Sequence, residues 1–286
     1  MRFLVLGASG MAGHVISIYL SEKGHDVVGV SRRPVQFVQS IALDATDSVA
    51  LRRVVEDGDY DVVINAIGIL NQYAEDFKAS AVYLNSYLPH YLAEITKSSP
   101  TRIFHMSTDC VFSGNTGPYT EKSIPDGRSF YDRTKALGEL IDHKNLTFRN
   151  SIVGPDISPD GIGLFNWFMK QSGSVDGYVK AIWNGITTIE LARAMLVASE
   201  SSSTGIVNLV PDEPISKYDL LCMFSIFMRR GMVLINPKNP GKLDKALKRT
   251  NEEFPYKVSD YESQISAMKE WIINHWYLYP HYHIER

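Results

Sequence analysis

The stretch LVLGASGMAGH, residues 4–14, decides the fold. An apolar run is followed by Gly7, Gly10 and Gly13 in a G-x-x-G-x-x-G spacing, and a helical segment begins within the same turn. Glycines in a strand-to-helix turn let the backbone approach a pyrophosphate, whose charge then lies at the positive end of the helix. Such glycines are common, so it is their place after the first strand, at the chain start, that favours a dinucleotide site.

Short β-branched runs alternate with helical stretches along much of the chain. Strands are predicted at 2–6, 26–30, 61–67, 102–108, 146–153 and 205–210. Helices are predicted at 11–23, 48–57, 74–98, 130–142, 187–201 and 260–276. Strands separated by helices form βαβ units and a parallel sheet covered on both faces. The predicted fold class is α/β, a Rossmann-type doubly wound parallel sheet with a smaller C-terminal substrate-binding lobe.

The regular alternation stops after Pro155, which predicts two parts. We expect a dinucleotide-binding domain over 1–154 plus about 186–210, and a substrate-binding lobe over 155–185 plus 211–286.

Composition excludes several classes of protein. The 286 residues are 44% hydrophobic, which is ample for a packed core, and the net charge of −3 comes without a basic stripe for nucleic acid or anionic lipid. No apolar run approaches the roughly 20 residues that span a bilayer, and the N-terminal run is too short for a signal peptide. Cys110 and Cys222 form no disulfide framework. We expect a cytoplasmic protein with no nucleic-acid or membrane partner.

The end of the second strand indicates which dinucleotide is bound. An NAD site usually has an acid there for the ribose 2′-hydroxyl, whereas this chain has Ser31, Arg32 and Arg33. Two guanidinium groups suit a 2′-phosphate, so NADPH is predicted, NADH stays open, and a solvated basic loop is the alternative. The rest of the predicted cofactor site comprises Ser9 and Met11 in the glycine turn, Asp44 at the end of a further strand between 33 and 48, and Ala66, Ile67 and Gly68 at the end of the strand 61–67.

The segment FYDRTK, residues 130–135, indicates the chemistry. Tyr131 and Lys135 lie four positions apart, so they share one helix face. A tyrosine with a pKa of about 10 is a poor acid or base near neutrality unless its phenolate is stabilised, and a nearby ammonium does this. The spacing alone is frequent by chance. Ser107, Thr108 and Asp109 lie at the end of the strand predicted at 102–108, where ligands bind in such sheets.

Longer motifs give the chain a family resemblance. They are GASGMAG at the start, NAIG at 65–68, LNSYLPHYLA at 84–93, MSTDCVFSG at 106–114, PYTEK at 118–122, YDRTKALGE at 131–139, and NGITTIELARA and NLVPDEPISKYDLL further on. These resemble the extended short-chain dehydrogenases/reductases, and within them the dTDP-4-dehydrorhamnose reductase group. The resemblance covers almost the whole chain.

The resemblance implies an activity and a set of residues. The implied reaction is NADPH-dependent reduction of a nucleotide-linked hexose 4-ketone for surface polysaccharide biosynthesis, with Thr108, Tyr131 and Lys135 as the catalytic set. Lys135 would also bind the nicotinamide ribose, and Asn85 matches an asparagine near the active site. The predicted substrate contacts are Asp109, Cys110, Val111, Trp183 and Arg249, although a solvated basic face is an alternative for Arg249 and core packing for Trp183. Relatives are often dimers, so a homodimer stays open.

Two departures from the family pattern leave the substrate open. Asp132 replaces the glycine that usually follows the catalytic tyrosine, and Cys110 stands where rhamnose reductases often have tyrosine. Both dTDP-linked and UDP-linked 4-ketosugars therefore stay open. Cys110 also occupies the position of the acid that a 4,6-dehydratase needs. A 4-epimerase uses the same three residues with tightly held NAD, and an NADP-binding regulatory subunit without turnover is the other alternative.

No metal site is predicted. His275, His281 and His283 gather near the C-terminus, but no thiol or carboxylate cluster accompanies them.

Overall fold

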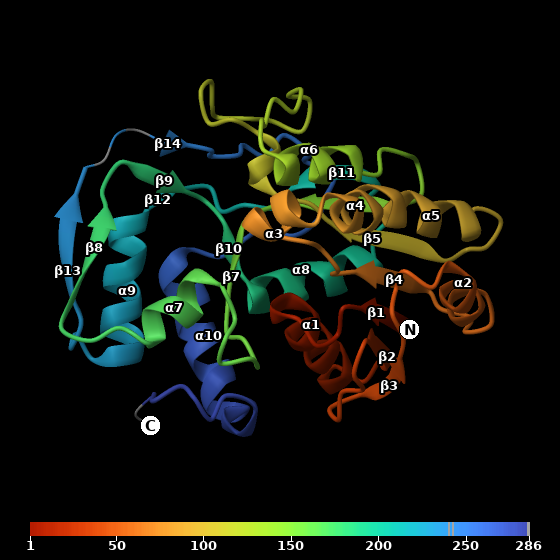
Figure 1. Ribbon diagram of the computed structural model, residues 1–286, viewed down its shortest axis with the longest axis horizontal. Helices are drawn as coiled ribbons and strands as arrows, with labels where there is room; N and C mark the ends of the chain where they lie inside the picture. The colour runs from red at the N-terminus through yellow and green to blue at the C-terminus, as the bar shows by residue number, and fades with distance from the viewer. Residues whose placement is uncertain (240, 242, 285–286) are drawn as a thin grey trace.

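The computed structural model describes residues 1–239, 241 and 243–284 and contains one large sheet between two layers of helices (Figure 1). Seven strands pair in the order β11-β6-β5-β4-β1-β2-β3, and every pairing is parallel. Their bounds are β1 Arg2–Leu6, β2 Asp26–Ser31, β3 Gln39–Ala42, β4 Val62–Asn65, β5 Arg102–Met106, β6 Leu146–Arg149 and β11 Gly205–Asn208. The predicted α/β fold with a doubly wound sheet is confirmed.

The central strands are apolar throughout because helices cover both faces of the sheet. Residues 3–6 of β1 and 62–65 of β4 are fully buried. The strand order reverses between β1 and β4, so the chain leaves these two strands in opposite directions across the sheet. Ligands of doubly wound sheets bind beside the carboxyl ends of the strands at such a reversal.

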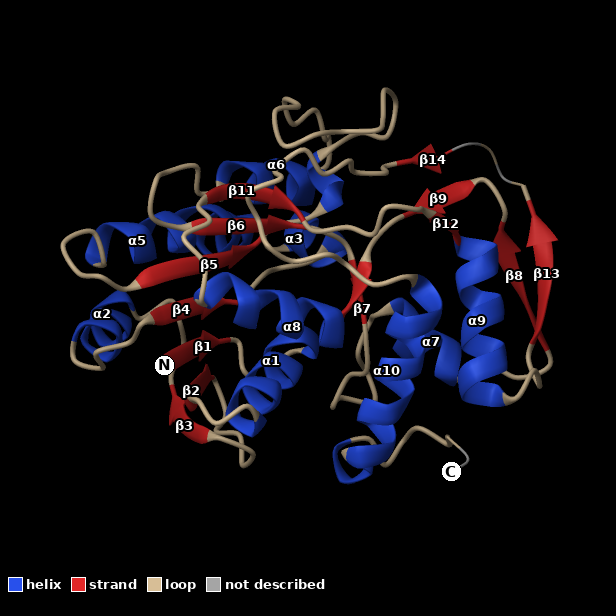
Figure 2. Ribbon diagram, turned by 180° about the vertical axis from the view of Figure 1, so that it is seen from behind, coloured by secondary structure: helices blue, strands red, loops and turns tan. Residues whose placement is uncertain are grey.

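Helices α1 (Met11–Glu22) and α8 (Thr188–Ser199) cover one face of the sheet, as Figure 2 shows from behind. The other face carries α2 (Ser48–Glu56), α5 (Leu88–Ile95) and α6 (Phe130–Leu137).

The single helix predicted over 74–98 is wrong in one respect, because the segment is interrupted. It consists of α3 (Asn71–Asp76), α4 (Lys78–Ala81), a π-helix (Val82–Tyr87) and α5. Pro89 has no N–H to donate to the carbonyl of Asn85 four residues earlier, and the chain accommodates this loss with a π turn.

A smaller lobe stands beside the strand ends (Figure 1). It contains α7 (Leu164–Met169), α9 (Lys217–Arg229), α10 (Tyr261–Asn274) and a short helix Trp276–Leu278. Its strands are β8 (Ser174–Tyr178) paired with β13 (Leu234–Lys238), and β9 (Ala181–Trp183) between β12 (Ile215–Ser216) and β14 (Leu243–Asp244). A two-stranded pair, β7 (Ile152–Val153) and β10 (Ile186–Thr187), lies between this lobe and the large sheet. The domain boundaries given above stay a prediction.

Sequence analysis did not predict helix α9, although its N-cap is written in the sequence. Ser216 Oγ accepts a hydrogen bond from the backbone N–H of Asp219, as an N-cap serine does. No helix in the described part of the chain combines the length and the apolar content that crossing a bilayer requires.

The C-terminal segment packs against helix α1 through a buried histidine. His14 Nδ1 donates to the carbonyl of Gly10 at 2.8 Å, so in the neutral ring Nε2 accepts from the hydroxyl of Tyr279 at 2.7 Å. The indole N–H of Trp271 donates to the same hydroxyl at 2.9 Å. His14 is fully buried, and this burial lowers its pKa from 6.5 to about 4. The neutral ring therefore links the glycine-rich turn to the end of the chain.

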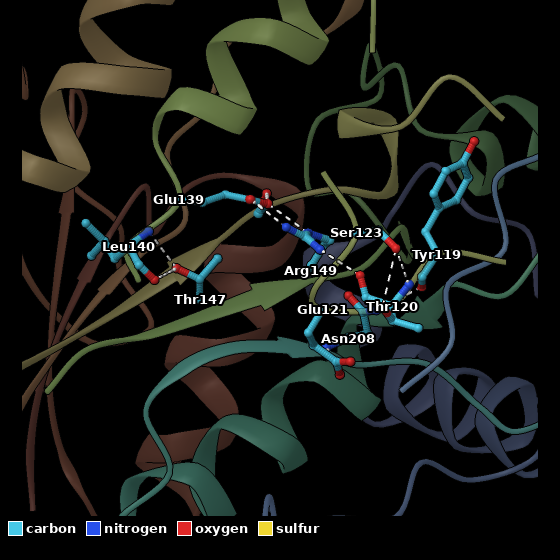
Figure 3. Close-up of polar contacts among 10 residues, drawn as sticks. Tyr119, Thr120, Glu121, Ser123, Glu139, Leu140, Thr147, Arg149 and Asn208 are labelled. Carbon is cyan, nitrogen blue, oxygen red and sulfur yellow. Dashed lines mark hydrogen bonds and ion pairs between the residues drawn. The ribbon is translucent and has the colours of Figure 1, made fainter. Parts of the chain in front are cut away.

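A buried ion pair joins Glu139, just after helix α6, to Arg149 of β6 (Figure 3). Arg149, the last residue of β6, donates through Nε and Nη2 to the two carboxylate oxygens of Glu139 at 2.9 and 2.7 Å. Ser107, which follows β5, donates to the same carboxylate at 2.6 Å. The side chains of Arg149 and Glu139 are 1% and 3% exposed. Bidentate geometry and a third donor satisfy the carboxylate.

We predict that His14 makes stability depend on pH. Folding favours the neutral imidazole, so the contribution is fully present above pH 6.5 and is lost as the pH falls toward 4. Wild type should lose up to about 3 kcal/mol of unfolding free energy over this range relative to His14→Gln. Urea unfolding at a series of pH values measures it, with exposed His143→Gln as control. Parallel curves for wild type and His14→Gln would refute the prediction.

We also predict that Arg149→Met lowers the free energy of unfolding by about 3–5 kcal/mol, because it leaves a buried carboxylate unpaired. The matched control is Arg52→Met, which removes an exposed i,i+4 pair with Glu56 and should cost no more than about 0.5 kcal/mol. Denaturant unfolding of both variants provides the comparison. Equal losses would show that burial of the pair has no consequence.

Candidate active site

A cleft with a volume of about 410 Å³ opens at the carboxyl ends of the central strands. It brings together residues predicted from four separate stretches of the sequence. From the predicted cofactor set it is lined by Gly10, Met11, Ala66, Ile67 and Gly68, and from the catalytic and substrate sets by Thr108, Asp109, Cys110, Tyr131 and Lys135.

The glycine-rich turn has the shape of a phosphate cradle. Gly7 has a φ of +83°, which disfavours any side chain. A Cβ on Gly13 would lie 2.1 Å from the carbonyl oxygen of Gly7, so glycine is required for helix α1 to pack against the turn. Gly10 is the N-cap of α1, and no side chain caps the first turn of the helix. Ser9 is exposed at this turn. The N-terminus of α1 is thus open to an anion.

The basic residues predicted for the cofactor follow β2 at the carboxyl end of the strand. Arg32 and Arg33 are exposed, and Ser31 turns its hydroxyl back to donate to the carbonyl of Arg33 at 2.6 Å. Hydrogen bonds from Thr46 lower the pKa of Asp44, and the positive charge of Arg32 lowers it further. Arg32 and Asp44 therefore lie near one another at the ends of β2 and β3.

Helix α6 presents Tyr131 and Lys135 on its buried face, as the spacing predicts. Ser129 begins the helix with a capping box, in which its hydroxyl accepts from the N–H of Asp132 and the Asp132 carboxylate accepts from the N–H of Ser129. Asp132, the residue that departs from the family pattern, is thus a helix cap. Its charge contributes least among the causes that raise the pKa of Tyr131.

The titratable groups of the cleft are all shifted by burial. Burial raises the pKa of Tyr131, the charges of Cys110 and Asp109 raise it further, and a hydrogen bond with the Thr108 side chain opposes the rise. Burial lowers the pKa of Lys135 to about 8. Its ammonium donates to the backbone carbonyl of Met106 at the end of β5. The expected lowering of the Tyr131 pKa by Lys135 stays a prediction.

Thr108 lies at the turn between β5 and a 3-10 helix, Asp109–Val111. Its hydroxyl accepts from the N–H of Cys110 at 3.2 Å and donates to the carboxylate of Asp109 at 3.1 Å. The Thr108 side chain is also near enough to Tyr131 to lower the pKa of its hydroxyl. The cleft therefore holds the hydroxyl groups of Thr108 and Tyr131 and the ammonium of Lys135, all on buried residues. Such an arrangement can bind and protonate a carbonyl oxygen.

Eleven residues of the predicted site are not among those that line this cleft. Seven of them belong to the glycine turn and to the ends of β2 and β3 described above, namely Gly7, Ser9, Gly13, Ser31, Arg32, Arg33 and Asp44. The other four lie elsewhere. Val111 is fully buried in a small apolar cluster with Phe112. Asn85 braces the loop after β4, because its amide pairs with both backbone groups of Ile69 and donates to Thr134. Trp183 is 5% exposed and packs in the core. Arg249 donates to the carbonyls of Asn251, Phe254 and Tyr256 and lines a separate cavity beside Pro118.

Sequence analysis overlooked Lys217, which the structure places in the cleft. Lys217 is the first residue of α9 and comes from the smaller lobe. A signal was present, because a cation in the first turn of a helix opposes the helix dipole and suggests a reason other than helix stability. Asn150, which follows β6, also lines the cleft, and neither polar atom of its side chain has a partner among the described residues.

Among the described residues, no group of three His, Cys, Asp or Glu side chains lies close enough together to hold a metal ion. His281 lies beside Tyr282, whereas His275 Nε2 donates to the Glu22 carboxylate at 2.8 Å, so these two histidines contact different residues.

Comparisons with known proteins agree with this geometry. Residues 1–151 match the RmlD substrate binding domain. A dTDP-4-dehydrorhamnose reductase of Streptomyces griseus is 34% identical over 140 residues, a match that spans 48% of this chain and 43% of the relative. The chain thus spans less than half the length of that relative.

Solved structures extend the likeness over the whole fold. A hypothetical dTDP-4-dehydrorhamnose reductase of Sulfolobus tokodaii aligns with a TM-score of 0.74 and 27% identity over 91% of this chain and 98% of its own. A dTDP-4-dehydrorhamnose reductase of Bacillus anthracis in complex with NADP aligns with a TM-score of 0.78 and 17% identity over 93% and 98%. The profile match covers more than half of the residues, together with the glycine turn and the Thr108, Tyr131 and Lys135 positions, and the chain therefore belongs to the RmlD substrate-binding-domain family.

Proposed function

We propose that this protein reduces the 4-keto group of a nucleotide-linked deoxyhexose, with NADPH as the hydride source. The substrate would be dTDP-4-dehydrorhamnose or a UDP-linked 4-ketosugar, in surface polysaccharide biosynthesis. The observation that carries the proposal is that Thr108, Tyr131 and Lys135 share one cleft with the glycine turn. The names of the relatives support it. The cytoplasmic location and the homodimer stay predictions.

The residues of the turn fit a dinucleotide. Gly7 has a positive φ, and a side chain at Gly13 would collide with the backbone of Gly7, so the cradle depends on glycine at both positions. Arg32 and Arg33 would bind a 2′-phosphate, which favours NADPH over NADH. Bound there, the nicotinamide would supply hydride to C4 of the sugar.

The side chains of the cleft would bind and protonate the ketone oxygen. Thr108 would hydrogen-bond this oxygen, and the hydroxyl of Tyr131 would donate the proton that completes the alcohol. Lys135, now held by the Met106 carbonyl, would hydrogen-bond the nicotinamide ribose and stabilise the phenolate that proton transfer leaves.

The arginines after β2 favour reduction over epimerisation. A 4-epimerase would use the same three residues with a tightly held NAD, which has no 2′-phosphate. Exposed Arg32 and Arg33 instead suit a 2′-phosphate.

We predict that Tyr131→Phe loses about 10²- to 10⁴-fold in turnover, the usual contribution of a positioned proton donor. The affinity for NADPH should stay unchanged, because the phenol hydroxyl does not hold the dinucleotide. The measurement is NADPH oxidation with dTDP- and UDP-linked 4-ketosugars side by side, and exposed Tyr73→Phe is the control. Unchanged turnover in Tyr131→Phe would remove the proposed proton donor. If wild-type protein binds NADP tightly and turns over none of these sugars, it is a binding module.

We predict that the double variant Arg32→Ala, Arg33→Ala weakens NADPH binding by roughly 10- to 100-fold, the loss expected for charge-assisted contacts to a phosphate. NADH affinity should change little, because NADH has no 2′-phosphate. Dissociation constants for both nucleotides test this, with Arg53→Ala, another exposed arginine, as control. An equal loss for NADH and NADPH would contradict the assignment.

A further inference from the structure

A second cavity, with a volume of about 680 Å³, adjoins the catalytic cleft within the smaller lobe. Two residues, Leu164 and Lys217, line both spaces. The far part of the second cavity has two half-exposed aromatic side chains, Trp167 and Tyr178. Lys217 therefore stands at the junction between the catalytic groups and an aromatic-lined space.

The ammonium of Lys217 has no anionic partner in the described part of the chain. It lies 4.3 Å from the centre of the Trp183 ring and forms no hydrogen bond or ion pair there. Asp109 is close enough for its charge to act on Lys217, but the two groups do not touch as an ion pair. The cation–π contact with Trp183 offsets only part of the loss of hydration.

The charge of Lys217 is unfavourable here for two physical reasons. Burial lowers its pKa to about 8, which measures how poorly its surroundings solvate the charge. Its position in the first turn of α9 also sets the charge against the helix dipole. Fold stability does not account for either cost, whereas a bound anion would offset both.

The three-part structure of a nucleotide sugar indicates which anion would bind Lys217. A nucleotide sugar has three parts in a row, namely the sugar, a diphosphate and a nucleoside. With the reacting carbon beside Tyr131 and Thr108, the rest of the molecule must leave the cleft, and the adjoining cavity with its aromatic walls suits a base. The diphosphate then lies between the two spaces.

We propose that Lys217 Nζ binds the diphosphate of the nucleotide-sugar substrate at the junction of the two cavities, an inference that rests on the proposed function. The second diphosphate in the site belongs to NADPH and lies at the glycine turn. Lys217 therefore selects for the substrate and not for the cofactor.

Binding of dTDP and UDP tests the proposal by calorimetry on the full chain saturated with NADP. Lys217→Met should weaken both nucleotides by roughly 10- to 100-fold, and Lys217→Arg should keep most of the affinity. Lys217→Gln, a polar replacement of similar length, gives a second loss-of-charge variant if the methionine variant folds poorly. The affinity for NADP should stay unchanged in each variant, which distinguishes the site for the substrate diphosphate from the site for the cofactor diphosphate.

The matched control is Lys245→Met. Lys245 also acts on the charge of Asp109 but lines neither cavity, so it should bind dTDP and UDP as wild type does. Unchanged dTDP and UDP affinity in Lys217→Met and Lys217→Gln overturns the proposal, as does an equal loss in Lys245→Met or wild type that binds neither nucleotide. These measurements need no turnover, so a failure of the proposed reduction appears separately, as nucleotide binding without consumption of any 4-ketosugar.

Discussion

The buried pair between Glu139 and Arg149 is the interaction on which the arrangement of the site depends. Glu139 lies just beyond helix α6, Arg149 ends β6, and Ser107, which donates to the same carboxylate, immediately precedes Thr108. One carboxylate thus fixes the helix that carries the phenol and ammonium relative to the turn that carries the second hydroxyl. Buried pairs of this kind contribute little net stability compared with apolar packing, but they define geometry, and the chemistry requires these groups to be held to within an ångström.

Burial sets the charge states in the cleft. It raises the pKa of Tyr131 and lowers the pKa values of Lys135 and Lys217. Burial disfavours the charged form of each of these groups, so a counter-charge brought close would stabilise it: a cation beside the phenolate of Tyr131, or an anion beside the ammonium groups of Lys135 and Lys217. One physical cause, the removal of water, therefore makes all three groups respond to charged neighbours.

The two parts of the chain meet through contacts between residues far apart in sequence. His14 hydrogen-bonds Tyr279 behind the glycine turn, and helix α9 carries Lys217 into the cleft beside Asp109. Leu164 and Lys217 line both the catalytic cleft and the adjoining cavity, so these two spaces meet where the two parts of the chain come together.

The sequence by itself determined the parallel sheet, the open turn at Gly7 to Gly13 and the shared face of Tyr131 and Lys135, because each follows from a period or a spacing within a few residues. Only the tertiary structure decided that His14 is buried, that Arg249 holds backbone carbonyls away from the cleft, and that Asp132 is a helix cap. Likewise, only the tertiary structure showed that Lys217 of the smaller lobe lines the cleft. These outcomes depend on which distant segments pack together, and local periodicity carries no information about that.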